Sequence, residues 1–469
     1  MRLLPTLPSN IKPFEIAARK RYTLLVRVVV LGGILSSPIW IWVLLFSAVQ
    51  DTYVPSLLFV PLIVVICVVG FMPLWRGKPQ VKQLLGTAIL ARLVAASFYI
   101  GLGVFVYDYS VDAFHYWSVG MQRMQDFSAV GWSAFQPPFW STNLINNICG
   151  LVMLATGNTL PGLFVLFSLA ALWGGYFFYR AFCIAFPAGD STLYGTLALL
   201  LPSNLFWSSA IGKDALAQLF IGVTTYGLAK VCQRLEPRSI VTCALGIAGV
   251  LVVRPHIAAM LAVAVTLPFA VGKSRGGLMH LAAKIVLVPI LIALSLRLVS
   301  QAGQFVGVET VDSTSSIERV NRLIKSTQIG GSAFNSGESL PVRVAESPLL
   351  MFRPFPWEVN NAMAAIASLE ALALLWFAWK RRRAMMAALH HWRKPYIGFI
   401  LTYAILFSIA FAVATSNFGI LVRERIMMVP LVLMLFCARL DVAEGRVYLS
   451  NRELACRGTR AVPIRRQLS

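Results

Sequence analysis

The chain has 469 residues, of which 58% are hydrophobic and 13% are charged, whereas a soluble globular protein carries about 25% charged residues. This composition excludes a soluble globular protein and indicates a polytopic membrane protein. The net charge of +22 would suggest a nucleic-acid partner in a soluble protein. Here the basic residues gather between apolar runs, which favours cytoplasmic loops and no nucleic-acid partner.

The apolar runs predict an all-α integral membrane protein with about twelve transmembrane helices in a single domain over 1–469. The first run follows a basic cytoplasmic arm, 1–22, and lacks a small-residue cleavage site, so we expect it to be retained. Both termini are then cytoplasmic. The predicted spans are 23–49, 57–75, 84–106, 160–179, 193–211, 215–231, 240–253, 257–271, 278–299, 361–379, 395–414 and 425–437.

The segment after the third span, 107–158, is predicted to be the first large outer loop. It is rich in aromatic residues, including Trp117, Trp132 and Trp140, which favours interfacial helices lying along the membrane surface. Its most apolar stretch, 141–155, is too short for a span. If this loop stays outside, the basic loops at 180–192, 232–238, 272–278 and 380–394 are all cytoplasmic.

The loop 107–158 begins with a motif of acidic and aromatic residues, Y-D-Y-S-V-D-A-F-H-Y-W. If this motif is helical, Asp108, Asp112 and His115 share one face, because residues three and four apart are neighbours. Two carboxylates and an imidazole beside a membrane span suit general acid/base catalysis or cation binding. The alternative is a solvated acidic loop with no chemical role.

A second large outer loop is predicted at 300–360. Its first half, 309–339, is either a mobile lid or a disordered loop. Its second half, 351–358, reads M-F-R-P-F-P-W-E, and its prolines predict a rigid platform at the membrane interface. The C-terminal tail, 439–469, is basic and is predicted to lie in the cytoplasm near anionic lipid.

The assignment of sides brings several ionisable residues to the outer mouth of the bundle. Basic residues beside spans are uncommon on that side, so each is a functional candidate. Each also has a structural alternative, such as a salt bridge at a helix end. Together they predict a cationic cavity for a phosphate, since arginine and lysine are phosphate ligands. The predicted binding residues are Lys213, Asp214, Arg254, His256, Arg353, Glu358, Arg423, Glu424 and Arg425.

The topology and three short motifs resemble the GT-C superfamily of membrane glycosyltransferases and O-antigen-polymerase-like proteins of polysaccharide assembly. The motifs are the acidic, aromatic loop at 107–117, W-S-S-A-I-G-K-D-A at 207–215, and V-R-E-R-I-M-M-V-P at 422–430. One feature departs from the superfamily pattern: the acidic loop follows the third span and not the first.

The resemblance implies a glycosyltransferase of the bacterial inner membrane, working in cell-surface glycan assembly. It would move sugar from a polyprenyl-phosphate or polyprenyl-diphosphate donor to a glycan acceptor on the extracytoplasmic face. Asp108 or Asp112 would then be the base, and the basic residues would bind the leaving phosphate. No cofactor or metal site is predicted, although a divalent metal is possible. An O-antigen-type polymerase, a lipid-linked sugar flippase or transporter, and a structural subunit of an export complex are the alternatives.

Overall fold

A computed structural model of the chain describes residues 53–76, 78–271 and 340–439. Every regular element in these ranges is a helix, which confirms the all-α prediction for this part of the chain. The predicted spans 23–49 and 278–299, the arm 1–22, the part 300–339 of the predicted loop 300–360 and the tail after Arg439 lie outside the described residues.

Six of the described helices are long and apolar enough to cross a membrane. Three shorter apolar helices accompany them, so a membrane protein is supported while the number of twelve spans stays a prediction. The six are α2 (Tyr53–Trp75), α3 (Pro79–Phe105), α6 (Leu160–Ala185), α9 (Lys213–Gln233), α15 (Ala362–Lys380) and α17 (Pro395–Ala414). The shorter ones are α7 (Ser191–Leu200), α10 (Pro237–Val253) and α11 (Pro255–Val271).

Two predicted spans are broken in the structure. The span predicted at 193–211 divides into α7 and α8 (Pro202–Trp207), and the break falls at Pro202, which cannot donate a helical hydrogen bond. The span predicted at 425–437 begins earlier, with α18 (Phe418–Arg425), and then turns before α19 (Val429–Cys437). Pro430 lies in the first turn of α19, where a proline is tolerated.

The predicted outer loop 107–158 contains two helices, α4 (Asp112–Val130) and α5 (Ser141–Thr156), joined by the 3-10 helix η2 (Gly131–Ala134). Their location at a membrane interface stays a prediction. Helix α4 begins at Asp112, and Asp108 lies before this helix with a left-handed φ of 42°. The predicted shared helical face of Asp108, Asp112 and His115 is therefore wrong.

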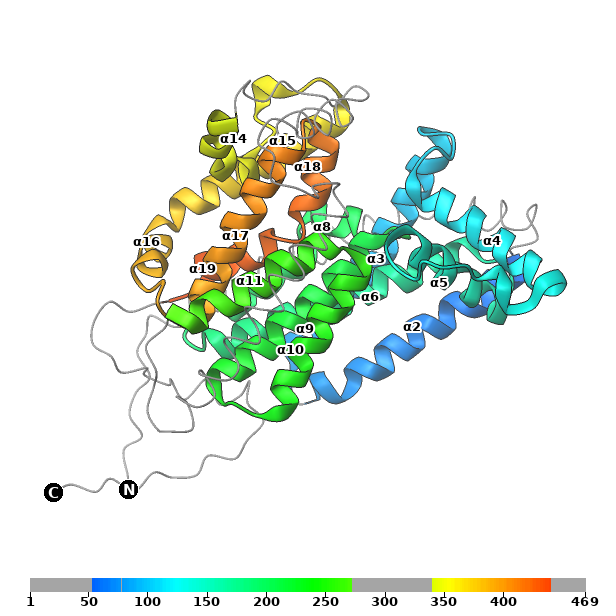
Figure 1. The fold of residues 1–469 in the computed structure, drawn as a ribbon, viewed down its shortest axis with the longest axis horizontal. Coiled ribbons are helices and arrows are strands. Elements are labelled where there is room, and N and C mark those ends of the chain that lie inside the picture. The colour runs from blue at the N-terminus through cyan, green and yellow to red at the C-terminus, as the bar shows by residue number, and fades with distance from the viewer. Residues whose placement is uncertain (1–52, 77, 272–339, 440–469) are drawn as a thin grey trace, which may run out of the picture.

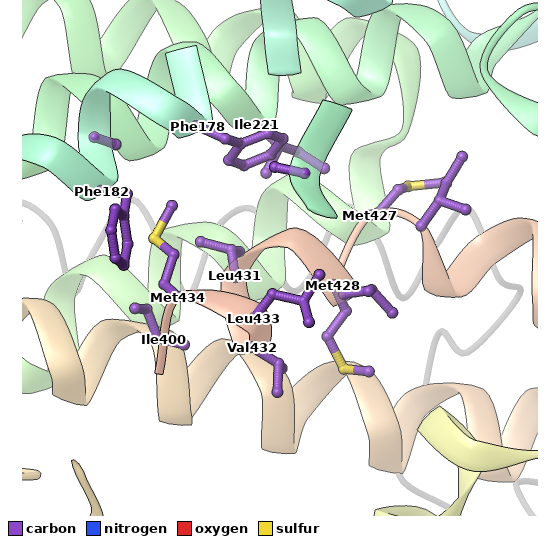
Figure 2. Packing of buried hydrophobic residues seen from close by; sticks show 14 of the residues in the cluster. Phe178, Phe182, Ile221, Ile400, Met427, Met428, Leu431, Val432, Leu433 and Met434 are labelled. Carbon is purple, nitrogen blue, oxygen red and sulfur yellow. The ribbon is translucent and has the colours of Figure 1, made fainter. Parts of the chain in front are cut away.

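The helices pack closely where glycines allow their backbones to approach. A Cβ atom on Gly174 of α6 would lie 2.5 Å from the Gln218 carbonyl oxygen of α9, and one on Gly222 would meet the Gly174 carbonyl oxygen. The short helix α19 is wholly buried, and Met427, Leu431 and neighbouring side chains pack against Phe178, Ile221 and Ile400 (Figure 2). This packing fixes α19, and α18, which precedes it, packs beside α8 and α15.

The contacts divide the bundle into two ends. We call the end formed by the N-terminus of α9, the C-terminus of α10 and the C-terminus of α17 the site end. The Gln233 side chain donates to the Ile184 carbonyl oxygen, so the C-termini of α9 and α6 lie together at the opposite end. In Figure 1, α4 and α5 lie on one side of the molecule, and α16 (Arg382–His390) lies on the other, at the opposite end.

The segment predicted to be a rigid platform is ordered. Residues 351–358 comprise the end of the 3-10 helix η3 (Ser347–Phe352), a cis peptide bond between Arg353 and Pro354, and the 3-10 helix η4 (Pro356–Glu358). The short helix α14 (Leu340–Glu346) precedes them. The predicted contact of the platform segment with a membrane interface is not tested by the structure.

Candidate functional site

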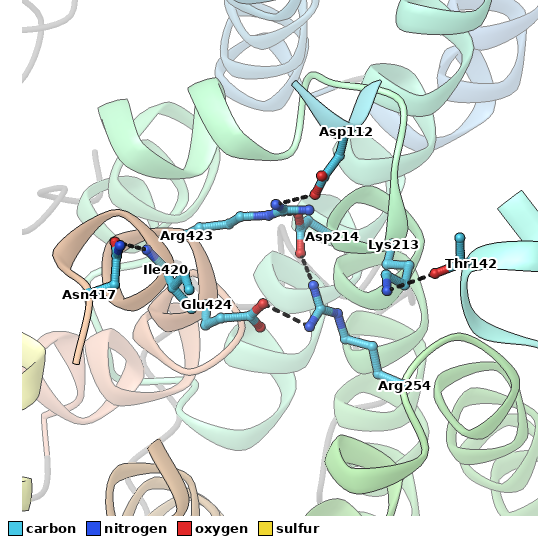
Figure 3. Close-up of polar contacts among 9 residues, drawn as sticks. All are labelled: Asp112, Thr142, Lys213, Asp214, Arg254, Asn417, Ile420, Arg423 and Glu424. Atoms are coloured by element: carbon cyan, nitrogen blue, oxygen red, sulfur yellow. Dashed lines mark hydrogen bonds and ion pairs between the residues drawn. The ribbon is translucent and has the colours of Figure 1, made fainter. Parts of the chain in front are cut away.

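Five ionisable side chains from four helices or helix ends form one connected network at the site end (Figure 3). At its centre, Asp214 accepts from Arg254 through Oδ1 and from Arg423 through Oδ2, the latter at 2.5 Å. The second guanidinium nitrogen of Arg254 donates to Glu424 Oε1 at 2.8 Å. Arg423 reaches outward to Asp112 Oδ2 at 2.7 Å. Acid and base therefore alternate along the network.

Local backbone structure positions each member of this network. Arg254 lies between α10 and Pro255, which begins α11, and a residue before proline favours an extended conformation. Asp214 lies in the first turn of α9, where a helix favours negative charge. The Asn417 side chain caps α18 by accepting from the Gly419 and Ile420 amides at 2.8 and 3.3 Å.

Burial differs strongly along the network. Side-chain exposure is 5% for Asp214 and 9% for Glu424, but 59% for Asp112. Burial, together with the negative charge of Asp214, raises the pKa of the Glu424 carboxyl, although the Arg254 guanidinium opposes this shift. Asp112 is therefore the carboxylate of this network that a molecule approaching from the solvent could reach.

The charges of the network are balanced, which corrects the prediction of a cationic cavity. Asp112, Asp214 and Glu424 offset Arg254, Arg423 and the nearby Lys213. Lys213 forms no ion pair with a described residue, and its Nζ atom donates only to the Thr142 hydroxyl, at 3.3 Å. An incoming phosphate would meet Lys213 directly, whereas at Arg423 it must displace a carboxylate.

The other residues predicted around this network are less closely involved. Asp108 lies on an exposed turn, and His115 is exposed in the first turn of α4; neither has a hydrogen bond or ion pair through its side chain within the described part of the chain. His256 is half-buried in the first turn of α11, where it interacts electrostatically with Arg254 and Lys213. Among the described residues, none of the three forms a side-chain hydrogen bond or ion pair with Asp112.

Arg425 belongs to a second, separate cluster. It is almost fully buried, pairs with Glu370 of α15 at 3.1 Å, and donates to the carbonyl oxygens of Met351 and Arg353 at 3.3 and 2.7 Å. Arg353 in turn binds Glu358, whose other oxygen accepts from the Phe355 amide. These contacts hold the platform segment against α15 and α18, and the predicted phosphate-binding role of Arg353, Glu358 and Arg425 stays a prediction.

An apolar cavity of about 530 Å³ lies beside the network, between α3, α8, α15 and α18. Phe418, Gly419 and Val422 of α18 line it, and Val422 directly precedes Arg423 in the chain. Ser203 and Glu370 are its polar lining residues, and Glu370 is already bound by Arg425 and by the Ser203 amide. The cavity suits a hydrocarbon chain.

Sequence reasoning missed two buried charges, Glu370 and Arg92. Arg92 lies midway along α3, is fully buried and donates to the Ser208 hydroxyl at 2.5 Å, while its Nε and second terminal nitrogen have no partner in the described structure. Both residues sit within runs predicted to cross the membrane, and an ionisable residue at such a depth is itself a signal of function.

No group of three or more His, Cys, Asp and Glu side chains in the described ranges is arranged to hold a metal ion. A divalent metal therefore stays a prediction without an assigned ligand set. Comparisons of the chain with models of protein families, with curated proteins and with solved structures find no match.

Proposed function

We propose that the protein is an integral membrane glycosyltransferase that uses a polyprenyl-phosphate-linked or polyprenyl-diphosphate-linked sugar on the extracytoplasmic face of a bacterial inner membrane. The observation that supports this proposal is the juxtaposition of an ionic network with an apolar cavity along one short helix, α18. A donor with a charged headgroup and a hydrocarbon chain needs both environments side by side.

The apolar cavity would hold the isoprenoid chain next to its phosphate. Phe418 and Val422 contact the cavity on one face of α18, while Arg423 points to the ionic network on another. A chain lying in the cavity would place its phosphate near Arg423 and near Lys213, and Lys213 has no acidic partner among the described residues. Arginine binds phosphate in a bidentate fork, and lysine adds a point charge.

The network suggests how binding and proton transfer are linked. A phosphate bound by Arg423 would take the place of Asp112, whose Oδ1 has no hydrogen bond to a described residue. The released carboxylate would accept the proton of the acceptor hydroxyl as its oxygen attacks the anomeric carbon. The bond from that carbon to the phosphate oxygen would break, and the phosphate would leave with the electron pair, stabilised by Lys213 and Arg423.

The test is transfer of labelled sugar from a synthetic polyprenyl-phosphate donor by the purified protein in vesicles. We expect Asp112→Asn to lower the transfer rate by about 10²–10⁴-fold, the usual contribution of a general base. Binding of the donor should survive, because an uncharged Asn at position 112 competes less strongly than Asp112 with the phosphate for Arg423. Arg423→Ala should weaken binding as well, since a charge-assisted hydrogen bond contributes about 1.5–3 kcal/mol.

Asp126→Asn is the matched control, since Asp126 is an exposed acid on the same helix as Asp112, almost four turns away. It should keep wild-type transfer. Wild-type transfer by Asp112→Asn would remove Asp112 from the mechanism. Movement of the intact donor across the vesicle membrane without transfer would favour the flippase alternative instead.

A further inference from the structure

The opposite end of the bundle has a dense basic surface of its own. Between the end of α15 and the start of α17, residues 380–394 read K-R-R-R-A-M-M-A-A-L-H-H-W-R-K, and no Asp or Glu occurs between Glu370 and Glu424. We call Lys380, Arg381, Arg382, Arg383, Arg393 and Lys394 the basic collar. This surface has no part in the proposed transfer reaction.

The collar lies where a lipid-facing stripe ends. Along α15, Ile366, Leu369 and Trp376 are 57%, 70% and 62% exposed, at a spacing that keeps them on one side of the helix. Such an exposed apolar stripe on a candidate span faces hydrocarbon. The stripe ends in Trp379, and the next residues are basic, which is the order expected where a helix leaves the hydrocarbon core for the headgroup region.

Tryptophans and basic residues alternate in direct contact around the collar. The Lys380 ammonium lies 4.7 Å from the Trp376 ring centroid, and the Arg382 guanidinium lies 4.6 Å from that of Trp379. Arg393 lies 5.3 Å from the Trp392 ring. The three cations form no ion pair with a described residue, so each keeps donors available to an external anion.

The short helix α16 continues the same surface. Met386 and Leu389 are exposed on it, one turn apart, and Arg382 lies one turn before Met386. Exposed apolar side chains next to basic ones are typical of a helix that lies along a membrane surface. The collar therefore combines charge with apolar groups that can enter the acyl-chain boundary.

We propose that the basic collar binds the headgroups of anionic phospholipids, with Trp376, Trp379 and Trp392 at the level of the lipid glycerol groups. Phosphate oxygens would accept from the cations that already contact the tryptophan rings. Zwitterionic lipids should bind less well, because their headgroups also carry a positive charge. Residues 371–423 contain no Asp or Glu that could pair with that charge.

The test uses the full chain in phosphatidylcholine vesicles that contain a small fraction of brominated phosphatidylglycerol or, separately, of brominated phosphatidylcholine. Bromine near the glycerol end of the acyl chains quenches nearby tryptophans. We expect quenching of the wild-type protein by the anionic lipid to be at least about twofold stronger. The triple variant Lys380→Gln, Arg382→Gln, Arg393→Gln should lose this excess.

The chain has twelve tryptophans, so a second variant, Trp376→Phe with Trp379→Phe and Trp392→Phe, identifies the signal and should also lose the excess. Arg234→Gln with Arg238→Gln is the matched control, because both arginines are exposed at the same end without a tryptophan contact. It should keep the excess. Equal quenching by both lipids in the wild-type protein, or an excess that survives in either triple variant or disappears in the control, would overturn the proposal.

Discussion

At the scale of single residues, Asp214 is the centre of the ionic network. It is the member that accepts from two arginines, Arg254 and Arg423, and it is nearly inaccessible to solvent. Glu424 pairs with Arg254 alone, and its Oε2 atom has no partner in the described structure. The two buried acids therefore differ in the number of arginines that they neutralise: Asp214 pairs with two and Glu424 with one.

This difference predicts unequal effects of two conservative substitutions. Asp214→Asn leaves the buried guanidinium of Arg254 and the partly buried one of Arg423 short of a counter-charge, and breaking one side of a buried pair costs about 3–5 kcal/mol. Glu424→Gln should cost less, because burial already raises the pKa of Glu424 and so weakens its preference for the charged form. The measurement is the thermal unfolding midpoint of each purified variant, and an equal or larger loss in Glu424→Gln would contradict the ranking.

The sequence could predict part of this network and not the rest. Asp112, Lys213, Arg254 and Arg423 each lie at the end of an apolar run, so the pattern of spans brings them to one surface. The role of Arg425 could not be predicted in this way. Each helical residue turns the side-chain direction by about 100°. Arg423 and Arg425 are two positions apart, so they point to nearly opposite sides of α18 and have different partners.

At the scale of elements, the breaks in two predicted spans have a common physical cause. Pro202 and Pro430 each lie at the start of a helix, where the preceding helix has ended. The sequence predicts that the charged triplet 423–425 opens the last span at the membrane surface, and in the structure partners from α4, α9, α10 and α15 neutralise it. A paired charge can enter the interior of a bundle, and sequence alone does not reveal the pairing.

The close contact between α6 and α9 predicts a strong dependence on two glycines. Gly222→Val should destabilise the protein, because any Cβ at this position meets the backbone of Gly174, which cannot move as a flexible side chain could. Gly86→Ala in α3 is the control, since no atom lies within 4 Å of its Cβ position. It should be neutral or should stabilise the helix by about 0.5–1 kcal/mol. Thermal unfolding of both variants is the measurement, and similar midpoints would argue against the close contact.

At the scale of the whole molecule, basic residues gather at the end away from the ionic network. The basic collar lies there, as do Arg234, which follows α9, and Arg238 in the first turn of α10. The positive-inside rule therefore predicts that this end is cytoplasmic and that the site end is extracytoplasmic. The alternation of spans could be predicted from sequence because hydropathy and loop charge are local properties. The side of the membrane on which each end lies, however, depends on every span of the chain, including the predicted spans 23–49 and 278–299, which lie outside the described residues.

The last prediction tests this orientation with one cysteine at each end. Asp126→Cys on α4 and Arg383→Cys on α16 both replace exposed side chains. A membrane-impermeant maleimide added to intact cells should label Asp126→Cys, while Arg383→Cys should react only after the membrane is permeabilised. The parent protein gives the background, which buried Cys67, Cys149, Cys243 and Cys437 should keep low. The reverse pattern would place the ionic network in the cytoplasm and exclude a donor on the outer face. Labelling of both cysteines from one side would contradict a bundle whose two ends lie across a membrane.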